Sequence, residues 1–107
     1  MSKLYFIETN GGWLTVATDE DGRACYMHED GREDGYPDAD PRWAEADAQE
    51  RETIAENWLR SIAEWNSFDD LYANCDIQNG FCGVYTAEDF SADLENGSDE
   101  IIASIDF

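Results

Sequence analysis

Positive charge is what this sequence lacks most. Its 107 residues include six lysines and arginines against 26 aspartates and glutamates, so the formal net charge is −20. Lys3 is the single lysine, and neither lysine nor arginine follows Arg60. Such a chain repels a phosphate backbone, which disfavours direct binding to DNA or RNA. The excess is larger than solubility requires and weakens the compact state by self-repulsion, so screening salt or a cationic partner should compensate it.

The sequence also lacks the signatures of membrane proteins, disulfide-rich secreted proteins and common enzymes. No apolar run approaches the length of a membrane span, and residues 1–12 do not have the pattern of a signal peptide. We therefore expect a cytoplasmic protein. Three cysteines without framework spacing indicate reduced, partly buried thiols. One histidine, with no nucleophile elbow, phosphate loop or metal-binding helix motif, predicts a protein that is not an enzyme and needs no cofactor.

Apolar residues make up 42% of the chain and aromatic residues 13%, which is enough to bury a core. The length predicts a single domain over residues 1–107. Strand-forming residues occupy 3–8, 13–18 and 24–28, and the first two segments are joined by the hairpin signal Asn10-Gly11-Gly12. These three segments predict an N-terminal antiparallel meander.

Helical spacing dominates the middle of the chain. Asp40 is a candidate cap, and a long helix should start between Pro41 and Glu50 and run to about Trp65. Its expected buried stripe contains Ile54, Ala55, Trp58, Leu59, Ile62 and Trp65.

Shorter elements are predicted beyond this helix. Capping boxes at residues 67–70 and 86–89 indicate two short helices, the second ending at Asn96-Gly97. Residues 81–85 are a possible strand. In the last segment, 100–107, the side chains Ile101, Ala103, Ile105 and Phe107 alternate as on one face of a strand. The predicted fold class is α+β, with an antiparallel β-sheet (N-terminal meander plus C-terminal strand) packed by one long helix and one or two short helices.

The acids are concentrated in blocks. Residues 19–56 hold fourteen acids and four arginines, and residues 64–107 hold eleven acids and no base, whereas residues 1–18 are neutral. On a helix, Glu52 and Glu56 are about 6 Å apart along the axis, which is comparable to two phosphate steps of about 3.4 Å in B-DNA. An ordered array of this kind imitates the charge density of a nucleic-acid backbone.

Two acidic patches and two aromatic anchors are the predicted partner-binding residues. The first patch combines the loop and the helix face, and the aromatic side chains beside it are candidates for exposed interface anchors. The first patch contains Glu29, Asp30, Glu33, Asp34, Asp38, Asp40, Glu45, Glu52 and Glu56; the second contains Asp89, Asp93, Glu95, Asp99 and Glu100; the anchors are Tyr36 and Trp43.

The Asp19–Glu56 block, the cation-free stretch after Arg60 and the short length support a resemblance in composition. The chain resembles the small acidic phage or mobile-element proteins that inhibit CRISPR effectors or restriction enzymes by imitating nucleic acid. It is also similar in size and charge to immunity proteins that plug basic nuclease toxins. The resemblance implies a stoichiometric inhibitor, monomeric or homodimeric, of a basic nucleic-acid-binding protein in an infected or host bacterial cell.

The same residues allow two metal-binding alternatives. A calcium loop counted from Asp19 fails, because its sixth residue is Ala24 and its twelfth is Asp30. Residues Cys25, His28, Cys75 and Cys82 form a possible zinc set, although residues 25 and 28 of one strand face opposite sides, so we predict no metal site and leave zinc open.

Adaptation to high salt also explains excess acid and scarce lysine. The neutral first hairpin and the blockwise distribution argue against such a salt-adapted housekeeping protein.

Overall fold

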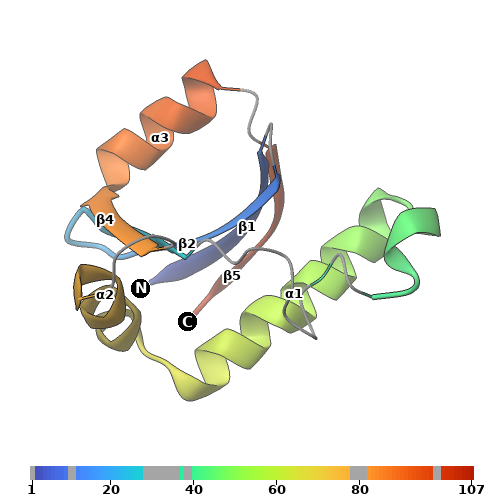
Figure 1. Cartoon of the computed structure of the whole chain (residues 1–107), viewed down its shortest axis with the longest axis horizontal. Coiled ribbons are helices and arrows are strands. Elements are labelled where there is room, and N and C mark those ends of the chain that lie inside the picture. The colour runs from blue at the N-terminus through green and yellow to red at the C-terminus, as the bar shows by residue number, and fades with distance from the viewer. Residues whose placement is uncertain (1, 10–11, 28–36, 38–39, 78–81, 98–99) are drawn as a thin grey trace.

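The computed structural model describes residues 2–9, 12–27, 37, 40–77, 82–97 and 100–107. An antiparallel sheet of five strands in the order β4-β3-β2-β1-β5 forms the centre of the fold, with α1 and α2 on one face and α3 on the other (Figure 1). The elements are β1 (Lys3–Thr9), β2 (Gly12–Thr18), β3 (Arg23–Met27), η2 (Trp43–Glu45), α1 (Ala48–Trp65), α2 (Phe68–Ile77), β4 (Cys82–Thr86), α3 (Ala87–Asn96) and β5 (Glu100–Asp106).

The α+β prediction is therefore confirmed. The three N-terminal strands form the expected meander, since β1 pairs with β2 and β2 with β3. The C-terminal strand β5 pairs with β1, while β4 pairs with β3, so these two late strands occupy opposite edges of the sheet.

Strand alternation builds the core on both sides of the sheet. On β1, Leu4 and Phe6 are fully buried beneath α1 and α2, whereas Ile7 faces the other side and packs with Val16 and Phe90 of α3. This follows from the two-residue period of a strand, which sends neighbouring side chains to opposite faces. The larger cluster is completed by Ala17, Cys25, Ala103, Trp43, Ile54, Ala55, Leu59, Phe68, Leu71 and Cys75.

Local capping explains where the helices begin. The Asp47 carboxylate accepts the Glu50 N–H at 2.8 Å and starts α1. The Ser67 hydroxyl accepts the Asp70 N–H at 3.2 Å before α2, and Thr86 and Asp89 form a reciprocal capping box before α3. The two predicted capping boxes are thus present, and each satisfies N–H groups that the first helical turn leaves without helical partners.

Two details of the predicted burial are wrong. Trp65 is 80% exposed, because it is the last residue of α1 and lines an open hollow with Ile105 and Asp106 at the end of β5. On β5 the register shifts, so that Ile7 pairs with Ile101 but Phe6 pairs with Ala103. This bulge makes Ile102 the extra residue, which packs against the core, and leaves Ile101 42% exposed.

Candidate functional site

Most of the predicted acidic loop lies outside the described residues. The residues concerned are Glu29, Asp30, Glu33, Asp34, Tyr36 and Asp38, together with Asp99 of the second patch. The structure therefore tests the placement of the remaining predicted residues, which belong to the turn before η2, to η2 itself, to α1, to α3 and to the start of β5.

Asp40 is paired with a cation from its own turn. Arg42 donates from Nη2 to Oδ2 of Asp40 at 2.8 Å and from Nε to Oδ1 at 3.1 Å, and the Arg42 backbone N–H donates to Oδ1 at 2.9 Å. The guanidinium and the backbone N–H lower the pKa of Asp40 to about 2. Asp40 is therefore a neutralised member of the predicted patch.

Trp43 is not an exposed anchor, which corrects the prediction. Its side chain is buried, with an edge-on contact to Trp13 at 5.3 Å between ring centroids and another to Phe6 at 6.2 Å. Arg51 lies over the same indole at 5.1 Å and donates from Nε to the Trp43 carbonyl at 3.0 Å. Adjacent acids suggested exposure, but the short 3₁₀ turn η2 rotates this ring into the core.

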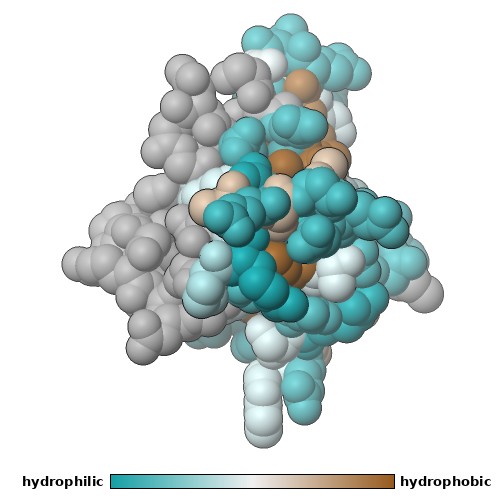
Figure 2. Space-filling view, turned by 90° about the vertical axis from the view of Figure 1, so that its right-hand side faces the viewer, coloured by the Kyte–Doolittle hydropathy of each residue, from teal (hydrophilic) through white to brown (hydrophobic). Residues whose placement is uncertain are grey.

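The acids of η2 and α1 differ in their solvent exposure and in their ion pairing. Glu45, Glu50 and Glu52 are exposed, whereas Glu56 is half-buried and accepts a hydrogen bond from Nη2 of Arg60 at 2.9 Å. Figure 2 shows the end of the molecule where α1 begins, and its described surface is mostly hydrophilic with a few small apolar areas. This end carries the exposed part of the first predicted patch.

The second predicted patch divides between two places. Asp89, Asp93 and Glu95 are exposed on α3, on the face of the sheet opposite α1. Glu100 instead lines a hollow of about 370 Å³ with Glu52 of α1 and Glu8 of β1. The structure therefore brings Glu100 to the α1 side and separates it from the α3 acids.

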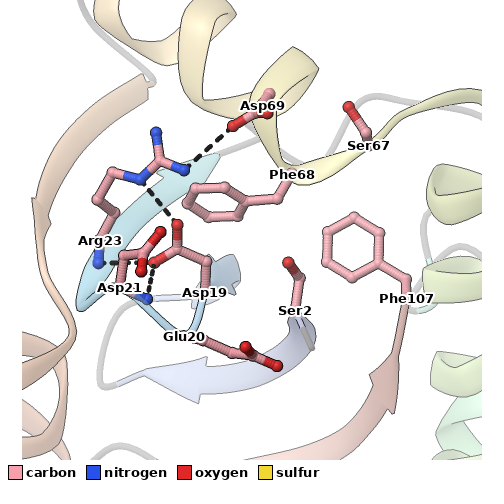
Figure 3. Close-up of a pocket in the computed structure, with 9 residues that line it drawn as sticks. All are labelled: Ser2, Asp19, Glu20, Asp21, Arg23, Ser67, Phe68, Asp69 and Phe107. Carbon is pink, nitrogen blue, oxygen red and sulfur yellow. Dashed lines mark hydrogen bonds and ion pairs between the residues drawn. The ribbon is translucent and has the colours of Figure 1, made fainter.

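The turn between β2 and β3 lines a pocket that was not among the predicted sites (Figure 3). Arg23 lies at its side and donates from Nε to Oδ2 of Asp19 at 2.7 Å and from Nη2 to Oδ1 of Asp69 at 3.1 Å. The same guanidinium lies 5.1 Å from the ring centroids of both Phe68 and Tyr72. The opposite charges of Asp19 and Arg23, four residues apart in the sequence, could have predicted this ion pair.

The state of Asp19 argues against a calcium role for this turn. Burial of its carboxylate opposes ionisation, but the backbone N–H and guanidinium of Arg23 outweigh that cost and lower the pKa of Asp19. The Asp21 N–H also donates to Oδ1 of Asp19 at 3.1 Å, and Gly22 has a φ of 85° that closes the turn. The carboxylate is thus occupied by protein donors.

The predicted zinc set is described only in part. Cys25 and Cys75 are buried, and the Cys75 thiol donates to the Tyr26 carbonyl at 3.4 Å. His28 and the side chain of Cys82 lie outside the described residues. Within the described part of the chain, no three acidic, cysteine or histidine side chains are grouped as metal ligands.

The described cations are all engaged with nearby groups. Lys3 lies 3.4 Å from Asp106, and Arg23, Arg42 and Arg60 pair with acids as above, while Arg51 contacts Trp43. Several exposed acids consequently have no ion pair with any described lysine or arginine. These are Asp21, Glu45, Asp47, Glu50, Glu52, Glu64, Asp70, Glu88, Asp89, Asp93, Glu95 and Glu100.

Comparisons with known proteins give no family. No family model, curated protein or solved structure matches this chain. Among the helices in the described part of the structure, none has the length and apolar character needed to cross a membrane.

Proposed function

We propose that this protein is a stoichiometric inhibitor that imitates nucleic acid and blocks a basic DNA- or RNA-binding protein, such as a CRISPR effector or a restriction enzyme. It acts without turnover, in the cytoplasm of a bacterial cell. The target's cationic groove accepts the carboxylates in place of phosphates, and counterions released from both surfaces favour the complex.

The observation that carries this proposal is the exposed, unneutralised charge of the described acids. Four of the five described cations pair with acids and Arg51 lies over Trp43, so the other exposed acids among the described residues give this surface a net negative field. A field of one sign steers a basic protein toward the surface and raises its association rate. Isolated surface acids balanced by neighbouring lysines would give no such field.

The proposed contact surface lies on the α1 side of the molecule. It contains the exposed Glu45 and Glu52 of the first predicted patch and gains Glu100 from the second. Since α3 lies on the other face of the sheet, its acids reach the same partner only if the groove wraps around the domain.

Salt adaptation remains the rival function, and a thermal melt in a KCl series separates the two. Mimicry predicts a domain that is folded at low salt and gains modest stability as salt screens its self-repulsion. A domain that melts in dilute buffer and folds only at about molar KCl would support adaptation to a saline cytoplasm.

The inhibitor proposal is tested by capture and competition. The immobilised protein is incubated with bacterial lysate, and retained proteins are eluted with duplex DNA, with RNA or with rising salt and then identified. We expect a basic nucleic-acid-binding protein that each of these competitors displaces. A retained partner that resists salt and both nucleic acids would contradict the proposal.

A matched pair of triple variants then locates the contact. Glu45, Glu52 and Glu100 are changed to Lys in one protein, and Glu88, Asp93 and Glu95 of α3 in the other, so both variants have the same net charge. We expect the first variant to lose at least about tenfold more affinity for the captured target than the second. Equal losses would show that total charge alone matters.

A further inference from the structure

The β5 strand forms an edge of the sheet that no described strand covers. It is last in the order β4-β3-β2-β1-β5 and has seven residues, Glu100–Asp106. Edge strands present backbone N–H and C=O groups that can pair with another chain, and many proteins block them with lysine or proline. Neither residue occurs in β5.

The register identifies which groups point outward. The Phe107 N–H donates to the Ser2 carbonyl at 2.9 Å, and Lys3 is opposite Asp106. In an antiparallel pair, hydrogen-bonded and non-hydrogen-bonded residues alternate. The backbone groups of Asp106 and Ser104 therefore point away from β1, toward the open edge.

Hollows flank both ends of this edge along α1. At the start of β5, Glu100 and Ile101 line the hollow of about 370 Å³ with Glu52. At the other end, Ile105 and Asp106 line a hollow of about 670 Å³ with Trp65. Because α1 begins beside the first hollow and ends beside the second, the helix and β5 run in the same direction.

Exposed apolar side chains accompany both hollows. Trp65 is 80% exposed and lines the hollow at the end of β5, whereas Ile101 is 42% exposed and lines the hollow at its start. A strand added beside β5 would place its alternate side chains near these surfaces, which is how strand addition combines backbone affinity with side-chain selectivity.

The negative charge along the edge favours a positively charged strand over a second copy of β5. Glu8 is directly opposite Glu100 in the β1–β5 register, where opposite charges would attract. Glu52 and Arg51 line the same hollow, so three acids and one arginine leave this end of the edge negative. Asp106 stands at the other end of β5. An antiparallel pair of two β5 strands would bring Glu100 of one copy close to Asp106 of the other, which argues against self-association.

We propose that β5 binds an extended, lysine- or arginine-rich segment of the partner protein by strand addition, with Ser104 and Asp106 supplying backbone hydrogen bonds. The positive charge of this segment rests on the proposed function, whereas the strand pairing is independent of it. Arg60 lies in the second hollow, where its pairing with Glu56 reduces its repulsion of a basic segment.

The test uses the full chain and a synthetic peptide of about nine alternating lysines and valines, a length slightly longer than β5. Ser104→Pro removes an outward N–H and places a ring at the open edge, where the sheet tolerates proline. Ser104→Ala keeps the N–H, and both substitutions leave the charge unchanged. Affinity is measured by titration calorimetry, and circular dichroism melts compare the folding of the variants.

We expect Ser104→Ala to bind like the unchanged protein. Ser104→Pro should bind about tenfold more weakly, because one hydrogen bond is lost and the proline ring crowds the added strand. Equal binding by both folded variants would overturn strand addition while leaving charge mimicry intact. Loss of salt-sensitive target binding in the lysate experiment would instead overturn the proposed function.

Amide hydrogen exchange of the unchanged protein keeps the test decisive if Ser104→Pro fails to fold. Bound peptide should protect the amides of Ser104 and Asp106 and leave those of α3 unchanged. Protection confined to helices, or a dimer in sedimentation without peptide, would contradict the proposal.

Discussion

Arg23 holds Asp19 by two groups at once, since its Nε donates to Oδ2 at 2.7 Å and its backbone N–H donates to Oδ1 at 2.8 Å. The Asp19 side chain is only 7% exposed although its turn is strongly acidic. The relationship links the β2–β3 turn to α2, because the same arginine also reaches Asp69.

Asp19→Ala should lower the free energy of unfolding by about 1–3 kcal/mol, because it leaves the donors of Arg23 and Asp21 without their acceptor. Urea unfolding at neutral pH measures the change. Asp21→Ala is the matched control in the same turn, and its exposed side chain predicts a change within about 0.5 kcal/mol. Equal losses in both variants would mean that the Asp19 bonds contribute little.

Acidic pH should remove the stability that three carboxylates with lowered pKa values contribute. The pKa values of Asp19 and Asp70 are lowered, and that of Asp40 falls from 3.8 to about 2. A carboxylate with a depressed folded-state pKa stabilises above its unfolded value, and this contribution disappears as pH falls through the folded value. Melting temperatures should therefore fall between pH 3.8 and about 2.

Asp40→Asn tests the assignment of this acid transition. The variant should be less stable than the unchanged protein at pH 5, and the difference should shrink as the pH approaches about 2. A difference that is constant over this pH range would show that protonation of Asp40 does not contribute.

Trp43→Ala and Trp65→Ala compare the same chemical change at a buried and an exposed site. Trp43 is 6% exposed and Trp65 80% exposed. Removing the first indole should cost about 3–5 kcal/mol through lost burial and a cavity, and removing the second about 0.5 kcal/mol or less. Chemical denaturation measures both. The affinity of Trp65→Ala for the lysine–valine peptide should be lower than that of the unchanged protein. A substantial loss of stability in Trp65→Ala would contradict the exposed position of the ring.

Glu100→Thr should stabilise the fold and weaken the proposed contact. The substitution removes the acid directly opposite Glu8 and inserts a residue that favours strands, which should add about 0.2–1 kcal/mol to the free energy of unfolding. Affinity for the basic peptide should fall in the same variant. Ser104→Thr is the control, because it introduces threonine at another exposed position of β5 and leaves every charge unchanged. Unchanged affinity would remove Glu100 from the contact surface.

Sequence patterns predicted the fold where the controlling interactions are local. The capping boxes at Ser67 and Thr86 need only residues three positions apart. The meander also follows from neighbouring segments and the turns between them.

The errors concern positions that distant contacts decide. Trp65 has the helical spacing of a core residue, but burial depends on what lies beside the end of α1. Trp43 lies among acids, yet Phe6 and Trp13 receive its ring. The bulge at Ile102 reflects pairing with β1, and the regrouping of Glu100 with Glu52 reflects sheet order, neither of which periodicity encodes.

The bond from the Phe107 N–H to the Ser2 carbonyl brings residues 2 and 107 together across adjacent strands. A short linker between them would close the backbone into a ring without altering the β1–β5 pairing, and the ring could be reopened at another turn.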